Sequence, residues 1–136
     1  MRLLQELKER FHLTYLFISH DLGLVRLMCN QVTVMYLGRI VENGPTEALF
    51  QAPTHPYTQA LLAALPKAEI GPWEGTLLQD EPPRPDAVHR GCPFRLRCPY
   101  AQDDSCAQVA PALAEIGPDH LVACHMASRR LDVMSA

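Results

Sequence analysis

The sequence predicts an α/β fold for residues 1–65 and an irregular, cysteine-rich extension toward the C-terminal end. Three observations support this prediction. Apolar residues recur at helical spacing between Leu3 and Phe11, and again after Leu22. Between these stretches, the continuous apolar run Leu13–Ser19 ends abruptly and is typical of a strand buried on both faces of a parallel sheet. Four of the five cysteines lie in the last third of the chain, after a stretch from Lys67 to Arg90 that has no sustained periodicity.

The elements of the α/β part follow from apolar spacing and from residues that favour caps and turns. Asp21 is a suitable N-cap for the helix that follows the apolar strand. Gly38 permits a tight turn between two strands. We expect Thr46 to cap a short helix and Pro56 to occupy the first turn of the next one. The expected elements are helices over 2–11, 22–29, 46–50 and 56–65 and strands over 13–19, 31–36 and 39–43.

Proline content changes the character of the chain after residue 65. Residues 66–90 show no helical or strand period, and the run Glu81-Pro82-Pro83-Arg84-Pro85-Asp86 is incompatible with a helix or a central strand. We interpret this segment as a linker or as an arm that wraps around the rest of the chain. The expected organisation is therefore an α/β part over 1–65, a proline-rich segment over 66–90 and a cysteine-ligated extension over 91–136.

Composition excludes several classes of protein. The chain has 136 residues, of which 48% are hydrophobic and 20% are charged, which is typical of a globular domain. A net charge of −3 gives no general attraction to nucleic acid. No apolar run reaches the length of a membrane span, and the N-terminal charges interleave with leucines, unlike those of a signal peptide. These features predict a cytoplasmic protein without direct membrane insertion.

The clustered cysteines are candidates for a metal site. Cys92, Cys98, Cys106 and Cys124 have the spacing C-x5-C-x7-C-x17-C, and clustered thiols in a cytosolic chain are more often ligands than disulfides. Four thiolates satisfy either tetrahedral zinc or a [4Fe–4S] cluster, and the wide gaps favour the larger inorganic core. His125 leaves a Cys3His zinc site open. Two disulfides, or four unrelated buried thiols, would also account for these cysteines.

Several motifs together resemble one family. They are Thr-Tyr-Leu-Phe-Ile-Ser-His-Asp, Val-Met-Tyr-Leu-Gly-Arg-Ile-Val-Glu-Asn-Gly-Pro-Thr, His-Pro-Tyr-Thr and the paired Cys-Pro-Phe and Arg-Cys-Pro segments of the tail. The chain resembles the C-terminal part of the ATP-binding subunit of oligopeptide/dipeptide/nickel-type ABC importers. The resemblance implies that His20 is the switch histidine, which contacts the γ-phosphate of ATP. It also implies a [4Fe–4S] cluster on the four cysteines, as in some members, with zinc as the alternative.

The same resemblance implies partners and also an absence. A second ATP-binding subunit and membrane permease subunits are the expected partners. The phosphate-binding motif Gly-x-x-x-x-Gly-Lys-Ser/Thr, the signature motif and the strand ending in Asp-Glu do not occur in this sequence. We therefore expect no ATPase activity from this chain alone, with ATP and Mg²⁺ bound only in a full-length subunit. Two rival interpretations are a free-standing iron–sulfur or zinc module and an inert, truncated remnant.

Overall fold

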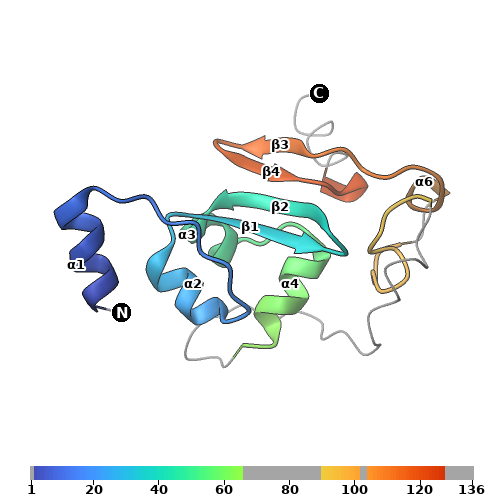
Figure 1. Cartoon of the computed structure of the whole chain (residues 1–136). Helices are drawn as coiled ribbons and strands as arrows, with labels where there is room; N and C mark the ends of the chain where they lie inside the picture. Colours follow the sequence, from blue (N-terminus) through green and yellow to red (C-terminus); the bar gives the residue numbers. More distant parts are fainter. Residues whose placement is uncertain (1, 66–89, 102–103, 128–136) are drawn as a thin grey trace.

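A four-stranded antiparallel sheet forms the centre of the computed structural model, which describes residues 2–65, 90–101 and 104–127 (Figure 1). The proline-rich segment predicted over 66–90 lies almost entirely outside the described residues. The helices are α1 (Arg2–Phe11), α2 (Leu22–Met28), α3 (Thr46–Gln51), α4 (Pro56–Ala63) and α6 (Asp104–Gln108). The strands are β1 (Gln31–Tyr36), β2 (Arg39–Pro45), β3 (Ala114–Gly117) and β4 (His120–Val122).

The β1–β2 hairpin confirms two predicted strands and the turn between them. Its two turn residues, Leu37 and Gly38, both have positive φ, at 46° and 75°. Positive φ at both positions defines the hairpin turn whose twist matches that of the flanking strands. Burial alternates along β1, so Val32, Val34 and Tyr36 face the core.

The C-terminal extension contributes to the same sheet, which corrects the expectation that it is irregular. The strand order is β1-β2-β4-β3, so β4 pairs with β2 across a long stretch of sequence. Glu42 lies opposite Val122 and Asn43 lies opposite Leu121, and β3 forms a second hairpin with β4. The sequence did not reveal these strands because each is only three or four residues long, too short to show a period of two.

The strand predicted over Leu13–Ser19 is wrong. These residues have no regular secondary structure, and the side chains of Leu16 and Ile18 are 91% and 90% exposed. A strand needs a neighbour for its backbone hydrogen bonds, and no described strand pairs with this segment. The described sheet is antiparallel throughout, so the predicted parallel sheet is not present in this part of the chain. An apolar run predicts burial only where a partner exists to cover it.

Helix caps confirm one prediction and correct another. Asp21 caps α2, because its carboxylate accepts a hydrogen bond from the Leu24 backbone N–H at 2.9 Å. Thr46 does not cap α3. It is buried as the first helical residue, and its hydroxyl donates to the Cys29 carbonyl at 2.6 Å. The exposed end of α2 offers that carbonyl as an acceptor, so Thr46 ties the two helices together.

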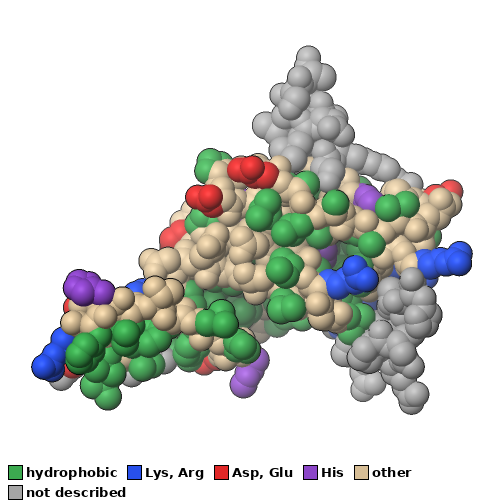
Figure 2. Space-filling view, turned by 45° about the horizontal axis from the view of Figure 1, so that its top comes forward, with side chains coloured by type: hydrophobic (Ala, Val, Ile, Leu, Met, Phe, Trp, Pro, Cys, Tyr) green, Lys and Arg blue, Asp and Glu red, His purple; other side chains and the backbone are tan. Residues whose placement is uncertain are grey.

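The main core lies between the hairpin and the helices, and the extension adds to it. Phe94 is 1% exposed, and its ring lies 5.1 Å from that of Tyr36 and 5.5 Å from that of Tyr57. By contrast, α1 stands apart from the sheet and exposes apolar side chains, which form a patch on this helix in Figure 2. Among the described residues, no helix is long and apolar enough to cross a membrane.

Candidate functional site

His20 lies on an exposed segment immediately before α2. The Ser19 hydroxyl accepts a hydrogen bond from the Asp21 backbone N–H at 3.0 Å, which shapes the turn that leads into the helix. The first residue after this turn, Leu22, packs on the main core, and so does Phe17 before it. His20 is therefore held at a fixed place at the edge of the core while its imidazole faces solvent. Such a ring can donate to an anionic oxygen of a ligand that approaches from outside.

The four cysteines lie on three segments that pack together. Cys92 is buried in the main core, and Cys98 and Cys106 pack against it. Cys124 is buried in a smaller adjoining cluster with Val122. The backbone of Cys92 donates to the Cys106 carbonyl at 2.8 Å, which holds two of the segments side by side.

The thiols are close enough to influence one another electrostatically. Burial raises the pKa of Cys98 to about 11, and the other three thiols each contribute to the same rise. Burial also raises the pKa values of Cys92 and Cys106, and both are raised further by Cys124. Like charges disfavour one another, so thiolates at these positions repel. These positions favour thiolates only if a cation is added between them.

The described residues do not form a finished single-ion site. No group of three or more His, Cys, Asp or Glu side chains among them is arranged to hold a metal ion. All five cysteines lie in the described ranges and are thiols, which leaves the disulfide interpretation without support. The Nε2 atom of His125 lies 2.9 Å from the Val109 carbonyl, so that ring nitrogen is already engaged. The expectation of a formed cysteine-ligated site is therefore not met by this arrangement.

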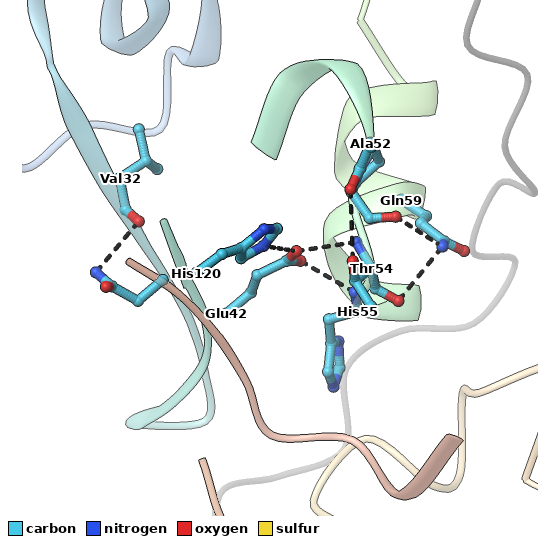
Figure 3. A network of polar contacts seen from close by, with 9 residues as sticks. Val32, Glu42, Ala52, Thr54, His55, Gln59 and His120 are labelled. Carbon is cyan, nitrogen blue, oxygen red and sulfur yellow. Dashed lines mark hydrogen bonds and ion pairs between the residues drawn. The ribbon is translucent and has the colours of Figure 1, made fainter. Parts of the chain in front are cut away.

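Sequence reasoning missed a buried polar network that joins β2, β4 and the segment before α4 (Figure 3). The carboxylate of Glu42 is fully buried and accepts backbone hydrogen bonds from Thr54 at 2.9 Å and His55 at 3.0 Å. Its Oε1 atom also lies 2.9 Å from Nε2 of His120 on β4. The available signal was a glutamate inside an apolar strand, which is costly unless it is paired.

His55 forms the cap of α4 and is uncharged. Its Nδ1 atom accepts the Tyr57 backbone N–H at 3.0 Å, and burial lowers its pKa from 6.5 to about 4. An imidazole that accepts at Nδ1 and resists protonation is a structural cap rather than an acid or base.

Comparison with known proteins identifies the family. The family model described as the C-terminal region of oligopeptide/dipeptide transporters matches residues 41–106. The chain is 44% identical over 131 residues to the oligopeptide transport ATP-binding protein AppF of Bacillus subtilis, covering 94% of this chain and 40% of that protein. It is 46% identical over 125 residues to a Brucella ovis protein named as a candidate peptide import ATP-binding protein, covering 91% and 39%.

The resemblance seen in the sequence is therefore confirmed. The matched family region covers most of β2, then α3 and α4, and it includes three of the four cysteines. The chain spans about two fifths of the length of the relatives it matches. By sequence, this chain belongs to the family of oligopeptide/dipeptide ABC importer ATP-binding subunits and corresponds to their C-terminal part.

Proposed function

We propose that this chain acts as the C-terminal portion of the ATP-binding subunit of an ABC peptide importer. The observation that carries the proposal is its similarity, at 44–46% identity, to proteins named for peptide import or oligopeptide transport. In this proposal ATP and Mg²⁺ bind only where the missing phosphate cradle is supplied by the rest of a full-length subunit. The partners are a second ATP-binding subunit and membrane permeases, which hold the protein at the cytoplasmic face of the membrane.

Within that assembly, His20 is proposed to sense the γ-phosphate. Its support is geometric: the residue is exposed and sits in a short turn between Ser19 and the capped start of α2. A ring fixed at its backbone and open at its imidazole can respond to a phosphate oxygen without disturbing the core. One such residue provides no binding energy comparable to a phosphate cradle, so it acts as a sensor and not as the ATP site.

The four cysteines are proposed to hold a [4Fe–4S] cluster. The support is the spacing C-x5-C-x7-C-x17-C, because a zinc site usually takes its cysteines from tight pairs with two to four residues between them. Burial and then the other three thiols raise the pKa of Cys98, so the four thiols lie near one another, which fits a cage with one cysteine per iron. The buried thiols also favour a cationic centre, because metal binding drives thiol deprotonation. When bound, the cluster would supply one-electron redox chemistry.

Peptide uptake tests the transport part of the proposal. We expect uptake to be restored when this chain is co-expressed with the N-terminal part of a relative in cells that lack the subunit. His20→Ala should abolish the restored uptake because the γ-phosphate sensor is lost. His12→Ala is the matched control, since His12 is another exposed histidine before α2. Uptake that persists at the wild-type level in His20→Ala contradicts the assigned role.

Iron content tests the cluster. We expect anaerobically prepared protein to be brown and to contain iron and sulfide in equal amounts, with about four iron atoms per chain. Cys98→Ser should lose most of this iron because serine is a poor ligand for the cluster. Cys29→Ser is the control, because Cys29 lies at the C-terminal end of α2 and outside the thiol group. A colourless wild type that binds only zinc would overturn the cluster assignment in favour of a zinc site.

A further inference from the structure

The buried carboxylate of Glu42 joins three separate segments of the chain. Figure 3 shows it between the segment that precedes α4, from which Thr54 and His55 donate, and the ring of His120 on β4. The residue is 0% exposed, and its two oxygen atoms receive contacts from three donors. A buried carboxylate with this many partners is satisfied, but an apolar residue at the same place would avoid the cost of burying a charge. Stability alone therefore does not explain why a glutamate occupies this buried position.

The β2–β4 pairing has little else to fix its register. The ladder is short: it pairs Glu42 with Val122 and Asn43 with Leu121, and just beyond it the Ala123 N–H donates to the Val41 carbonyl at 2.9 Å. Short ladders slip easily unless side chains or turns fix them.

His120 fixes the register of β4 on β2 through two contacts, one with Gly44 and one with Glu42. Continuing the observed register places His120 opposite Gly44, and a Cβ atom at Gly44 would lie 2.9 Å from the histidine ring. The ring therefore packs directly on the glycine backbone, while its Nε2 atom reaches the diagonal neighbour Glu42. Only one register satisfies both the ring and the carboxylate.

Register matters here because β4 leads directly to Cys124. A slip by one residue would turn the thiol to the opposite face of the sheet, and a slip by two would move it about 7 Å along the strand. Either change would take Cys124 away from the three thiols with which it interacts.

We propose that Glu42 is a positioning residue for the cysteine site, which acts through His120 to set the register of β4 and hence the location of Cys124. This inference rests on the proposed four-cysteine site for its functional meaning, but its structural part stands on the network itself. Under this proposal, a residue of the β1–β2 hairpin helps to build the cysteine site of the C-terminal extension. The cysteine site would then depend on the α/β part of the chain.

Amide hydrogen exchange on the full chain tests the register. In Glu42→Gln, the side-chain NH2 group takes the place of one oxygen, so it faces either the His55 N–H or the Thr54 N–H, and at least one hydrogen bond is lost. We expect protection of the Ala123 amide to fall at least tenfold, while amides of the β1–β2 ladder keep theirs. His120→Leu should behave like Glu42→Gln. His120→Gln should recover most of the protection, because its side-chain N–H can still donate to Glu42.

Leu49→Ala is the matched control for general destabilisation. Leu49 is 2% exposed in α3 and belongs to the main core rather than to the network. This variant should lower protection of Ala123 and of the β1–β2 amides together. If Glu42→Gln gives the same uniform loss, or no loss at Ala123, the positioning role is refuted.

Iron reconstitution separates this inference from the proposed cluster. After anaerobic treatment with ferrous iron and sulfide, Glu42→Gln should bind less than half of the wild-type iron, whereas Leu49→Ala should bind a wild-type amount. If the wild type itself binds no iron, the cluster assignment fails, and the exchange result still decides the register. If Glu42→Gln shows the exchange change but binds iron normally, Glu42 sets the strand and not the site, which also overturns the proposal.

Discussion

Phe94→Ala is expected to destabilise the chain by about 3–5 kcal/mol, the range for truncating a large buried aromatic residue. Phe94 is 1% exposed and sits at the centre of an aromatic group, with its ring 5.1 Å from Tyr36, 5.5 Å from Tyr57 and 5.6 Å from His55. It lies between Cys92 and Cys98 and is the main side chain that anchors this segment on the hairpin and α4. A loss of this size is comparable to the whole stability of many small domains.

Urea denaturation measures this effect, and reactivity of Cys92 toward a thiol reagent provides a second readout. Leu96→Ala is the control, because Leu96 lies two residues away and is 59% exposed. It should change the free energy of unfolding by no more than about 0.5 kcal/mol. Phe94→Leu keeps an apolar side chain and should give an intermediate loss with a folded protein. A loss below about 1.5 kcal/mol for Phe94→Ala would show that the aromatic group is not the anchor.

Local sequence signals predicted those parts of the fold that depend on local chemistry. Asp21 as a cap, Pro56 in the first turn of α4 and Gly38 in a tight turn are all found in the structure. Each depends on a residue that satisfies or restricts its own backbone, so neighbouring sequence is sufficient. The hairpin was predictable for the same reason, since its alternation and turn are contiguous.

The errors arose where the structure depends on distant partners. The segment Leu13–Ser19 has the composition of a buried strand, but no described strand pairs with it, and most of its apolar side chains remain exposed. Conversely, β4 is too short to be recognised, yet β2 provides a partner for it. Thr46 differs from its predicted role because the Cys29 carbonyl, 17 positions earlier, competes for its hydroxyl. A sequence pattern indicates that a segment requires a pairing or packing partner, but it does not show whether the fold provides one.

The candidate site shows the same division. Spacing and residue type singled out Cys92, Cys98, Cys106 and Cys124, and the structure brings their thiols within electrostatic reach of one another. The pair formed by Glu42 and His120 was not predicted, because 78 positions separate the two residues. Ligand candidates are visible as residue types, whereas the contacts that position them depend on sheet register, which no local pattern encodes.

A methyl group at Gly91 is expected to separate the segments that carry Cys92 and Cys106. Gly91 has φ +73°, and a Cβ atom there would lie 2.4 Å from the Cys106 carbonyl oxygen and 2.5 Å from that of Ala107. Both neighbours are backbone atoms, so no side-chain rotation relieves the clash. The hydrogen bond from the Cys92 N–H to the Cys106 carbonyl, 2.8 Å long, should therefore break.

Gly38→Ala separates backbone strain from this collision, because Gly38 has nearly the same φ, +75°, and a Cβ atom at this position would have nothing within 4 Å. The free energy of unfolding of Gly38→Ala should fall only by the cost of placing a residue with a Cβ atom in the left-handed conformation, about 1–2 kcal/mol. Gly91→Ala carries that cost as well as the clash, so its loss in urea denaturation should exceed the loss for Gly38→Ala by at least about 2 kcal/mol. Exchange of the Cys92 amide should accelerate only in Gly91→Ala. Equal losses in the two variants would mean that the two cysteine segments do not approach each other as closely as Gly91 allows.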